Sequence, residues 1–269
     1  MNRRKTEAVI LDWAGTTVDY GCFAPVQAFI TAFEEYGITP TLAEVREPMG
    51  MLKRDHVRTM MNMERIRGEW KRVHGRDFTE ADVEQVYQTS EKSILRIVHR
   101  FADPKPHVLE VVRKLREEGI RIGSTTGYTD EMMRIVVPAA AEKGYSPDCW
   151  FSPNSVGNFG RSYPYMIFEN LKKLEVTSVA AAVKVGDTVS DIKEGLAAGM
   201  PSLGILEGSS AMGLTEEEYE ALPAEEKERL CGQVREKFLA AGATAVLRNL
   251  SELPAFLEEL DYYSARSAQ

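Results

Sequence analysis

Residues 8–19 read AVILDWAGTTVD, and this stretch decides the fold. Four apolar residues end in Asp12 and pass into a turn of small and hydroxyl-bearing residues. A short apolar run bounded by a turn is typical of a buried strand in a parallel sheet. Open α/β sheets bind ligands beyond the carboxyl ends of their strands, so Asp12 stands where functional groups gather. Alone, such an aspartate is as often a turn former as a catalytic group.

The rest of the chain repeats this pattern of strand and turn. Further apolar runs occur at residues 120–124, 149–151, 180–185 and 202–206. Segments with the apolar spacing of helices occur at residues 108–118, 131–142, 165–173 and 190–198. Strands that alternate with helices of this length predict an α/β core, a Rossmann-like doubly wound parallel sheet. Beyond it we expect helices at 216–222, 224–240 and 250–260 and a late strand at 243–247.

Residues 25–100 break the alternation, because they contain helix-like segments and no convincing strand. We expect helices at residues 25–36, 42–47, 52–69 and 79–98. The prolines at 104 and 106 then provide a stiff return to the core. We therefore predict an α/β core domain of residues 1–24 and 101–269 and an inserted α-helical cap domain of residues 25–100.

Composition excludes several classes of protein. The chain of 269 residues has a formal net charge of −8, without the basic stripe that nucleic-acid binding requires. No stretch approaches the roughly 20 apolar residues of a membrane span. Cys22, Cys149 and Cys231 lack the spacing of a zinc site or a disulfide framework. We expect a cytoplasmic protein with no nucleic-acid or membrane partner.

Two later strand ends carry groups that suit an anion and a metal ion. Residues 123–128, GSTTGY, offer hydroxyls, backbone N–H groups and a helix start to an anion. The GDTVSD stretch places Asp187 and Asp191 at the start of a helix. With Asp12 they supply hard oxygen ligands suited to Mg²⁺. Between these loops Arg161 supplies a fixed cation able to hold a phosphate group bidentately.

In order and spacing these stretches resemble the four motifs of the haloacid dehalogenase superfamily: Asp12 with Thr17, Thr126-Gly127, Arg161, and Asp187 with Asp191. The resemblance implies that Asp12 attacks phosphorus. It also implies a set of groups that hold the phosphoryl group: Thr126, Gly127 and Arg161. The segment 25–100 resembles the inserted cap of that superfamily.

The same resemblance implies Mg²⁺ as the cofactor, with Asp12, Asp187 and the backbone carbonyl of Ala14 as ligands and Asp191 as a support. Position 14 is also where the sequence departs, since phosphatases of the superfamily usually carry a second aspartate there. That aspartate protonates the leaving group, a contribution of roughly 10²- to 10⁴-fold. Alanine cannot transfer a proton, so we expect a leaving group that needs none.

The cap stretch 49–56, MGMLKRDH, offers a different chemistry. A lysine amine condenses with a carbonyl compound to an iminium ion, which accepts the electrons released when a neighbouring bond breaks. Lys53 would thus favour cleavage of a carbon–phosphorus bond next to an aldehyde. His56, three residues on, shares its helix face and would exchange its proton, unless it is merely a hydrogen-bonded histidine.

Residues 12–21, 49–56 and 123–128 closely resemble the phosphonatase family of this superfamily, and the similarity runs over most of the chain. The resemblance implies hydrolysis of phosphonoacetaldehyde within 2-aminoethylphosphonate degradation, through a Lys53 Schiff base and an Asp12 aspartyl-phosphate. It implies a homodimer formed through the caps. Met49, Cys22 and Tyr128 either line the substrate site or only pack. Ser162 departs from the family, which commonly has proline after the arginine.

Two other functions stay open at this point. A phosphate-monoester phosphatase or a phosphomutase of the same superfamily would share the fold and Asp12, although Ala14 argues against both. A catalytically inert module that senses a phosphorylated metabolite would also keep the fold. A phosphatase would turn over ordinary phosphate esters, and an inert module would be unaffected by Asp12→Asn, whereas the first hypothesis needs a reactive amine at Lys53.

Overall fold

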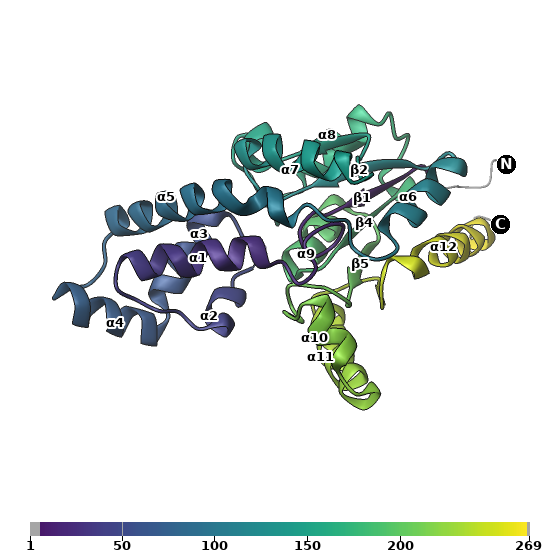
Figure 1. Ribbon diagram of the computed structural model, residues 1–269. Helices are drawn as coiled ribbons and strands as arrows, with labels where there is room; N and C mark the ends of the chain where they lie inside the picture. Colours follow the sequence, from purple (N-terminus) through teal and green to yellow (C-terminus); the bar gives the residue numbers. More distant parts are fainter. Residues whose placement is uncertain (1–5, 50, 268–269) are drawn as a thin grey trace.

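The computed structural model describes residues 6–49 and 51–267 and contains a six-stranded sheet in the order β3-β2-β1-β4-β5-β6 (Figure 1). All neighbouring strands are parallel. The strands are β1 (Ala8–Leu11), β2 (Arg121–Thr125), β3 (Cys149–Phe151), β4 (Ala182–Gly186), β5 (Ser202–Ile205) and β6 (Ala245–Leu247). The predicted doubly wound α/β core is confirmed.

The position of β1 explains why its end is the functional edge. The strand order reverses beside β1, because the chain proceeds to β2 on one side and returns to β4 on the other. Such a switch point leaves a crevice beyond the carboxyl ends of the strands. Leu11 is in register with Ser124 of β2 and Val185 of β4, so the loops after all three strands begin at one level.

Helices cover both faces of the sheet: α6 (Val108–Glu117), α7 (Asp130–Glu142), α8 (Tyr165–Lys173), α9 (Val189–Ala198), α11 (Ala224–Ala240) and α12 (Leu253–Ser267), with a short α10 (Glu216–Ala221). Alternate residues of β1 point to opposite faces of the sheet. Because helices cover both faces, all four residues of β1 are buried. Val9 and Leu11 join the hydrophobic cluster of one face, and Ala8 and Ile10 that of the other.

The cap is a lobe of helices at one end of the core (Figure 1). Its helices are α1 (Phe23–Glu35), α2 (Leu42–Arg46), α3 (Lys53–Asn62), α4 (Glu64–His74) and α5 (Glu80–Ile97), with the 3₁₀ turn Val98–Phe101 leading back. The lobe has its own hydrophobic cluster, whose buried members run from Val26 to Val86. This cluster supports the proposed domain limits, residues 25–100 for the cap and 1–24 with 101–269 for the core.

One predicted element is wrong. The expected single helix at residues 52–69 is two helices, α3 and α4, separated at Met63, whose backbone is extended. Helical spacing continues through Met63, so the pattern gave no signal of a break. The cause is tertiary: the turn lets α4 bring Ile66 and Trp70 into the cap cluster beside Met60 of α3.

Two other predicted boundaries shift. The strand expected at 180–185 begins at Ala182, because Ser178 accepts a hydrogen bond from the Ala180 N–H and forms a 3₁₀ turn first. The last helix is preceded by a 3₁₀ turn, Leu250–Glu252, and continues to Ser267.

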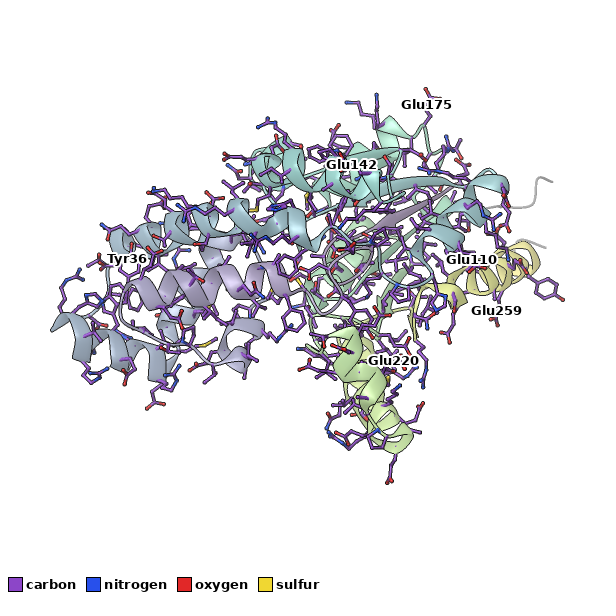
Figure 2. The ribbon with its side chains drawn as sticks, in the orientation of Figure 1. Tyr36, Glu110, Glu142, Glu175, Glu220 and Glu259 are labelled. Carbon is purple, nitrogen blue, oxygen red and sulfur yellow. The ribbon has the colours of Figure 1, made fainter. Side chains whose placement is uncertain are left out.

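The outer faces of the helices are charged, as expected of solvated helices. Glu110, Glu142 and Glu220 are exposed on three of them (Figure 2). Within the described part of the chain, no helix combines the length and the apolar character needed to cross a membrane.

Candidate active site

The loop after β1 is a compact turn that presents Asp12 to the crevice. The Thr17 hydroxyl donates to the Asp12 carbonyl at 2.9 Å and closes the loop. Gly15 has φ +88°, a value that favours glycine, and its α-carbon lies against the Asp187 carboxylate. Asp19 then accepts the N–H groups of Phe23 and Ala24, each at 2.9 Å. The loop that carries the predicted nucleophile thereby also starts the first cap helix.

The loop after β2 provides the predicted anion-binding groups. The Thr126 hydroxyl accepts a hydrogen bond from the Tyr128 N–H at 3.0 Å, which fixes the turn through Gly127. Helix α7 follows at once and is capped by Thr129. Thr126 and Tyr128 are both buried. Thr126, Gly127 and Tyr128 thus line one cavity with Asp12, just before α7 begins.

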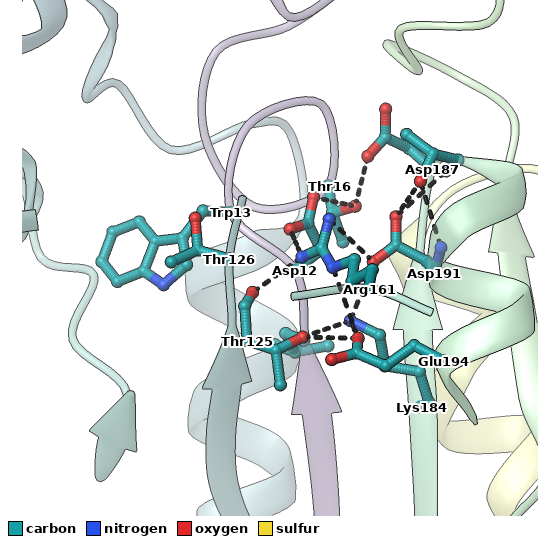
Figure 3. A network of polar contacts seen from close by, with 12 residues as sticks. Asp12, Trp13, Thr16, Thr125, Thr126, Arg161, Lys184, Asp187, Asp191 and Glu194 are labelled. Atoms are coloured by element: carbon teal, nitrogen blue, oxygen red, sulfur yellow. Dashed lines mark hydrogen bonds and ion pairs between the residues drawn. The ribbon is translucent and has the colours of Figure 1, made fainter. Parts of the chain in front are cut away.

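Arg161 lies in the loop before α8 and its side chain is 3% exposed (Figure 3). One terminal nitrogen, Nη2, forms an ion pair with Asp12 and donates to the Thr125 carbonyl at 3.0 Å. Asp191 and Glu194 each lie 3.3 Å from the guanidinium. Burial lowers the pKa of Arg161, but the three carboxylates outweigh it and raise the pKa overall. The predicted cation thus reaches the nucleophile with Ser162 in place.

Three buried carboxylates, those of Asp12, Asp187 and Asp191, offer oxygen atoms within 4.8 Å of one another. Burial, then the charges of Asp12 and Asp191, raise the pKa of Asp187. This repulsion is what a bound divalent cation would relieve, and carboxylate oxygens are ligands that Mg²⁺ accepts. The residues therefore fit a metal site.

The three carboxylates differ in how far other groups already satisfy them. Asp191 contacts the Lys184 amine at 2.9 Å and accepts a hydrogen bond from Thr188. Burial raises its pKa, but the cations Arg161 and Lys184 lower the pKa overall. Among the described residues, Asp187 accepts hydrogen bonds from neutral donors, the Thr16 hydroxyl at 3.0 Å and the Ser210 N–H at 2.7 Å, and the cation Lys105 acts on it without a hydrogen bond. This difference supports Asp187 as a direct ligand and Asp191 as its support.

The cap contributes Lys53, the first residue of α3, which is 9% exposed. Its amine lies 5.6 Å from the ring centres of both Phe29 and Tyr128. Burial lowers the pKa of Lys53, and Arg161 lowers it further, against opposing effects of Cys22 and Asp12. A lysine with a lowered pKa has more of the neutral, nucleophilic amine at physiological pH.

His56 lies deeper in the cap than a proton-transfer residue at the substrate would. It is fully buried and stacks on Phe29 with ring centres 4.0 Å apart. Burial, then the charge of Lys53, hold its pKa well below the usual range, so the imidazole is neutral. Its helix position relative to Lys53 follows the prediction, but it does not line the cavity described next.

A cavity of about 30 Å³ gathers most of the predicted residues. It is lined by Asp12, Ala14, Cys22, Pro25, Met49, Lys53, Thr126, Gly127, Tyr128, Arg161 and Thr188. A second cavity of about 450 Å³ shares Lys53 and Gly127 with it and is lined by cap and core residues, among them Arg54, Tyr87 and Asn154. Lys53 thus lines both cavities.

Sequence reasoning missed two fully buried charged residues, Lys184 of β4 and Glu194 of α9 (Figure 3). The available signal was Lys184 itself, a lone charge in the otherwise apolar run 180–185. Charges are rarely buried unless they are paired. Glu194 gave a weaker signal, three residues after Asp191 and therefore on the same face of α9.

Comparisons with known proteins identify the family of the chain. A model of the haloacid dehalogenase-like hydrolases matches residues 6–199. The chain is 51% identical over 257 residues to a phosphonoacetaldehyde hydrolase of Lysinibacillus sphaericus, with 96% of both chains covered. It is 47% identical to a bifunctional phosphonoacetaldehyde hydrolase/aminoethylphosphonate transaminase of Clostridioides difficile, covering 98% of this chain and 41% of that protein.

A solved structure extends the comparison to the whole fold. The phosphonoacetaldehyde hydrolase-like protein of Oleispira antarctica superposes with a TM-score of 0.94 at 36% identity, covering 97% of this chain and 94% of that one. Both lobes therefore share the arrangement seen there.

Gly15→Ala tests the metal site. A β-carbon at this position would lie 2.2 Å from Asp187 Oδ2, and φ of +88° already disfavours alanine. We expect the variant to lose the rise in melting temperature that Mg²⁺ gives the parent, because Asp187 must move. Differential scanning fluorimetry with and without Mg²⁺ measures this, with Gly75→Ala, also at positive φ but with no atom near the added carbon, as the matched control. An unchanged Mg²⁺ response would contradict the assignment of Asp187.

Proposed function

Since this chain belongs to the haloacid dehalogenase-like hydrolases and, within them, to the phosphonoacetaldehyde hydrolases, we propose that it cleaves the carbon–phosphorus bond of phosphonoacetaldehyde. The products are acetaldehyde and phosphate, and one water is consumed. One observation carries the proposal beyond resemblance. The buried amine of Lys53 and the carboxylate of Asp12 line one small cavity, with Ala14 where a general acid would stand.

In the first half of the proposed reaction, Lys53 forms a covalent bond to the aldehyde carbon. Its neutral amine adds to the aldehyde carbon, and loss of water gives an iminium ion joined to the carbon that bears phosphorus. The Asp12 carboxylate attacks phosphorus, and the electrons of the broken bond pass into the iminium to form an enamine. Protonation of the enamine carbon and hydrolysis of the resulting imine release acetaldehyde and the free lysine.

In the second half, the reaction takes place at the phosphorylated Asp12. Water hydrolyses the aspartyl-phosphate and releases phosphate. Arg161, Thr126 and the Gly127 N–H hold the phosphoryl oxygens in both halves, since they face the same cavity.

Ala14 has a second consequence for Lys53, because both side chains line this cavity. A carboxylate at position 14 would favour the charged ammonium and suppress the nucleophilic amine. Alanine therefore suits a leaving group that needs no acid and also an amine that must be neutral. The same argument disfavours a phosphate-monoester phosphatase or a phosphomutase, whose alkoxide leaving groups need the missing acid.

We propose Mg²⁺ as the cofactor, held by Asp12, Asp187 and the Ala14 carbonyl. When bound, it would offset the negative charge that Asp12 and the phosphonate bring together. Asp191 would keep the loop of Asp187 in place.

Met49, Cys22 and Tyr128 would shape the substrate cavity as neutral walls. Burial raises the pKa of the Cys22 thiol and of the Tyr128 phenol well above their usual ranges, so both stay protonated. His56, which shares a helix face with Lys53, is the candidate to accept a proton from the Lys53 ammonium; it is neutral and packed on Phe29. A purely structural role for His56 remains the alternative.

Borohydride reduction tests the proposal. Reducing the reaction mixture with phosphonoacetaldehyde should fix an ethyl-type adduct on Lys53 and stop turnover, because the imine carbon is trapped. Peptide mass spectrometry locates the adduct. Lys53→Arg should take up none, whereas Lys92→Arg, an exposed lysine of the same cap, should behave as the parent does. Turnover that continues unmodified in borohydride would refute the Schiff base.

The lowered pKa of Lys53 predicts the pH dependence of imine formation. The neutral amine reacts, so the rate of trapping with acetaldehyde and borohydride should rise with pH and reach half its maximum below the ordinary lysine value of about 10.4. Stopped assays from about pH 6 to about pH 11.5, a range that includes the ordinary lysine value, measure this midpoint. A midpoint at the ordinary value would mean that burial does not tune the amine.

We also propose a cytoplasmic homodimer formed through the caps. Leu42, Met51 and Val73 are exposed apolar residues of the cap, while Phe159, Tyr163, Tyr165 and Phe168 form an exposed aromatic group on the core. Sedimentation equilibrium should give twice the chain mass of 30.1 kDa. Val73→Asp should dissociate a cap dimer and Tyr165→Asp should not; the reverse result would move the interface to the core.

A further inference from the structure

Lys184 is a buried cation that the proposed reaction does not use. It stands in β4 between Val183 and Val185, is fully buried and does not line the substrate cavity. Its amine donates to the Thr125 hydroxyl at 2.8 Å and lies 2.9 Å from Asp191 and 3.3 Å from Glu194 (Figure 3). Burying a lysine costs several kcal/mol unless its charge is well paired. Lys184 therefore acts through its ion-pair partners Asp191 and Glu194, which both contact Arg161.

Glu194 is the partner without another assigned role. Its Oε2 accepts a hydrogen bond from the Thr125 hydroxyl at 2.9 Å and lies 3.3 Å from Nε of Arg161. Arg161 therefore meets a carboxylate on each side of its guanidinium: Asp12 at Nη2, Asp191 at Nη1 and Glu194 at Nε. Arg161 comes from an irregular loop, so its aim depends on these partners rather than on a helix or strand.

The three carboxylates do not persist equally through the proposed reaction. When Asp12 bonds to phosphorus it loses its negative charge, and Arg161 loses that ion pair while it must still hold the phosphoryl oxygens. Asp191 and Glu194 remain. These two carboxylates would repel each other in a buried site, and the Lys184 amine between them offsets that repulsion.

We propose that Lys184 and Glu194 form a positioning pair that keeps Arg161 aimed at the phosphoryl group after Asp12 has become an acyl phosphate. This inference rests on the proposed function. It assigns the pair to carbon–phosphorus cleavage and phosphate release, and it leaves imine formation at Lys53, on the cap, to other residues.

Glu194→Gln tests the pair. Glutamine keeps the size and an oxygen for Thr125 but removes the charge facing Nε of Arg161. We expect kcat for phosphate release to fall by about 10- to 100-fold, since a displacement of about 1 Å can cost about 100-fold. Inorganic phosphate, titrated calorimetrically with Mg²⁺ present, should bind more weakly. The maximal rate of Lys53 trapping by acetaldehyde and borohydride, measured at a pH where the amine is fully neutral, should match the parent, because acetaldehyde carries no group for Arg161.

Controls separate this role from a merely structural one. Glu142→Gln, an exposed change on α7 (Figure 2), should match the parent in all three measurements. If Glu194→Gln fails to fold by circular dichroism, Glu194→Asp, which retracts the charge by one methylene, should give the same split. Equal losses in trapping and in phosphate binding, or an unchanged kcat, would overturn the proposal.

A double-mutant cycle tests whether Lys184 and Glu194 act together. Lys184→Met should lower the melting temperature, since Asp191 and Glu194 then lose one of the two cations that offset their repulsion. Lys184→Met with Glu194→Gln should recover part of that loss and have a kcat close to that of Glu194→Gln alone. Additive losses would show two independent residues. If the parent releases no phosphate from phosphonoacetaldehyde, the proposed function fails. The calorimetric affinity for inorganic phosphate still tests whether Lys184 and Glu194 position Arg161.

Discussion

The balance of charge at the carboxyl end of β1 is the constraint on which the rest of the structure depends. Asp12, Asp187, Asp191 and Glu194 bring four carboxylates into one buried region, against Arg161 and Lys184. That excess of negative charge is tolerable with a divalent cation and costly without one. The register of β1 with β2 and β4 brings the loops that carry these groups to one level. The sheet thereby sets the positions of the buried charges.

On the cap, the buried group is a potential cation, the Lys53 amine. In the proposed reaction Lys53 lies near acidic residues and must still be neutral when it meets an aldehyde. The amine is buried beside Phe29 and Tyr128, and Arg161 adds a like charge; together these lower its pKa against the attraction of nearby anions. Arg161 thereby serves both halves of the site: it faces the nucleophile and it helps keep the amine free.

Much of this site was predictable because its signals are local. Asp12, Thr126 and Asp187 each follow an apolar strand, and parallel strands end at one edge, so their meeting could be inferred from the sequence. Lys184 and Glu194 were missed because their importance lies in partners distant in sequence: a loop arginine, Arg161, and Thr125 of β2. The break at Met63 was missed for the same reason, since only packing of Trp70 and Ile66 in the cap requires it. His56 was placed on the right helix face, but its stacking on Phe29 is a tertiary fact.

The central claim is that a cap lysine replaces the missing acid at Ala14. Phosphate release from phosphonoacetaldehyde in the presence of Mg²⁺, compared between the parent and Lys53→Arg, tests it most directly. Arginine keeps the positive charge but cannot form an iminium ion. We expect that the parent releases phosphate and that Lys53→Arg, folded and still able to bind phosphate, does not. Equal rates in the two proteins would contradict it.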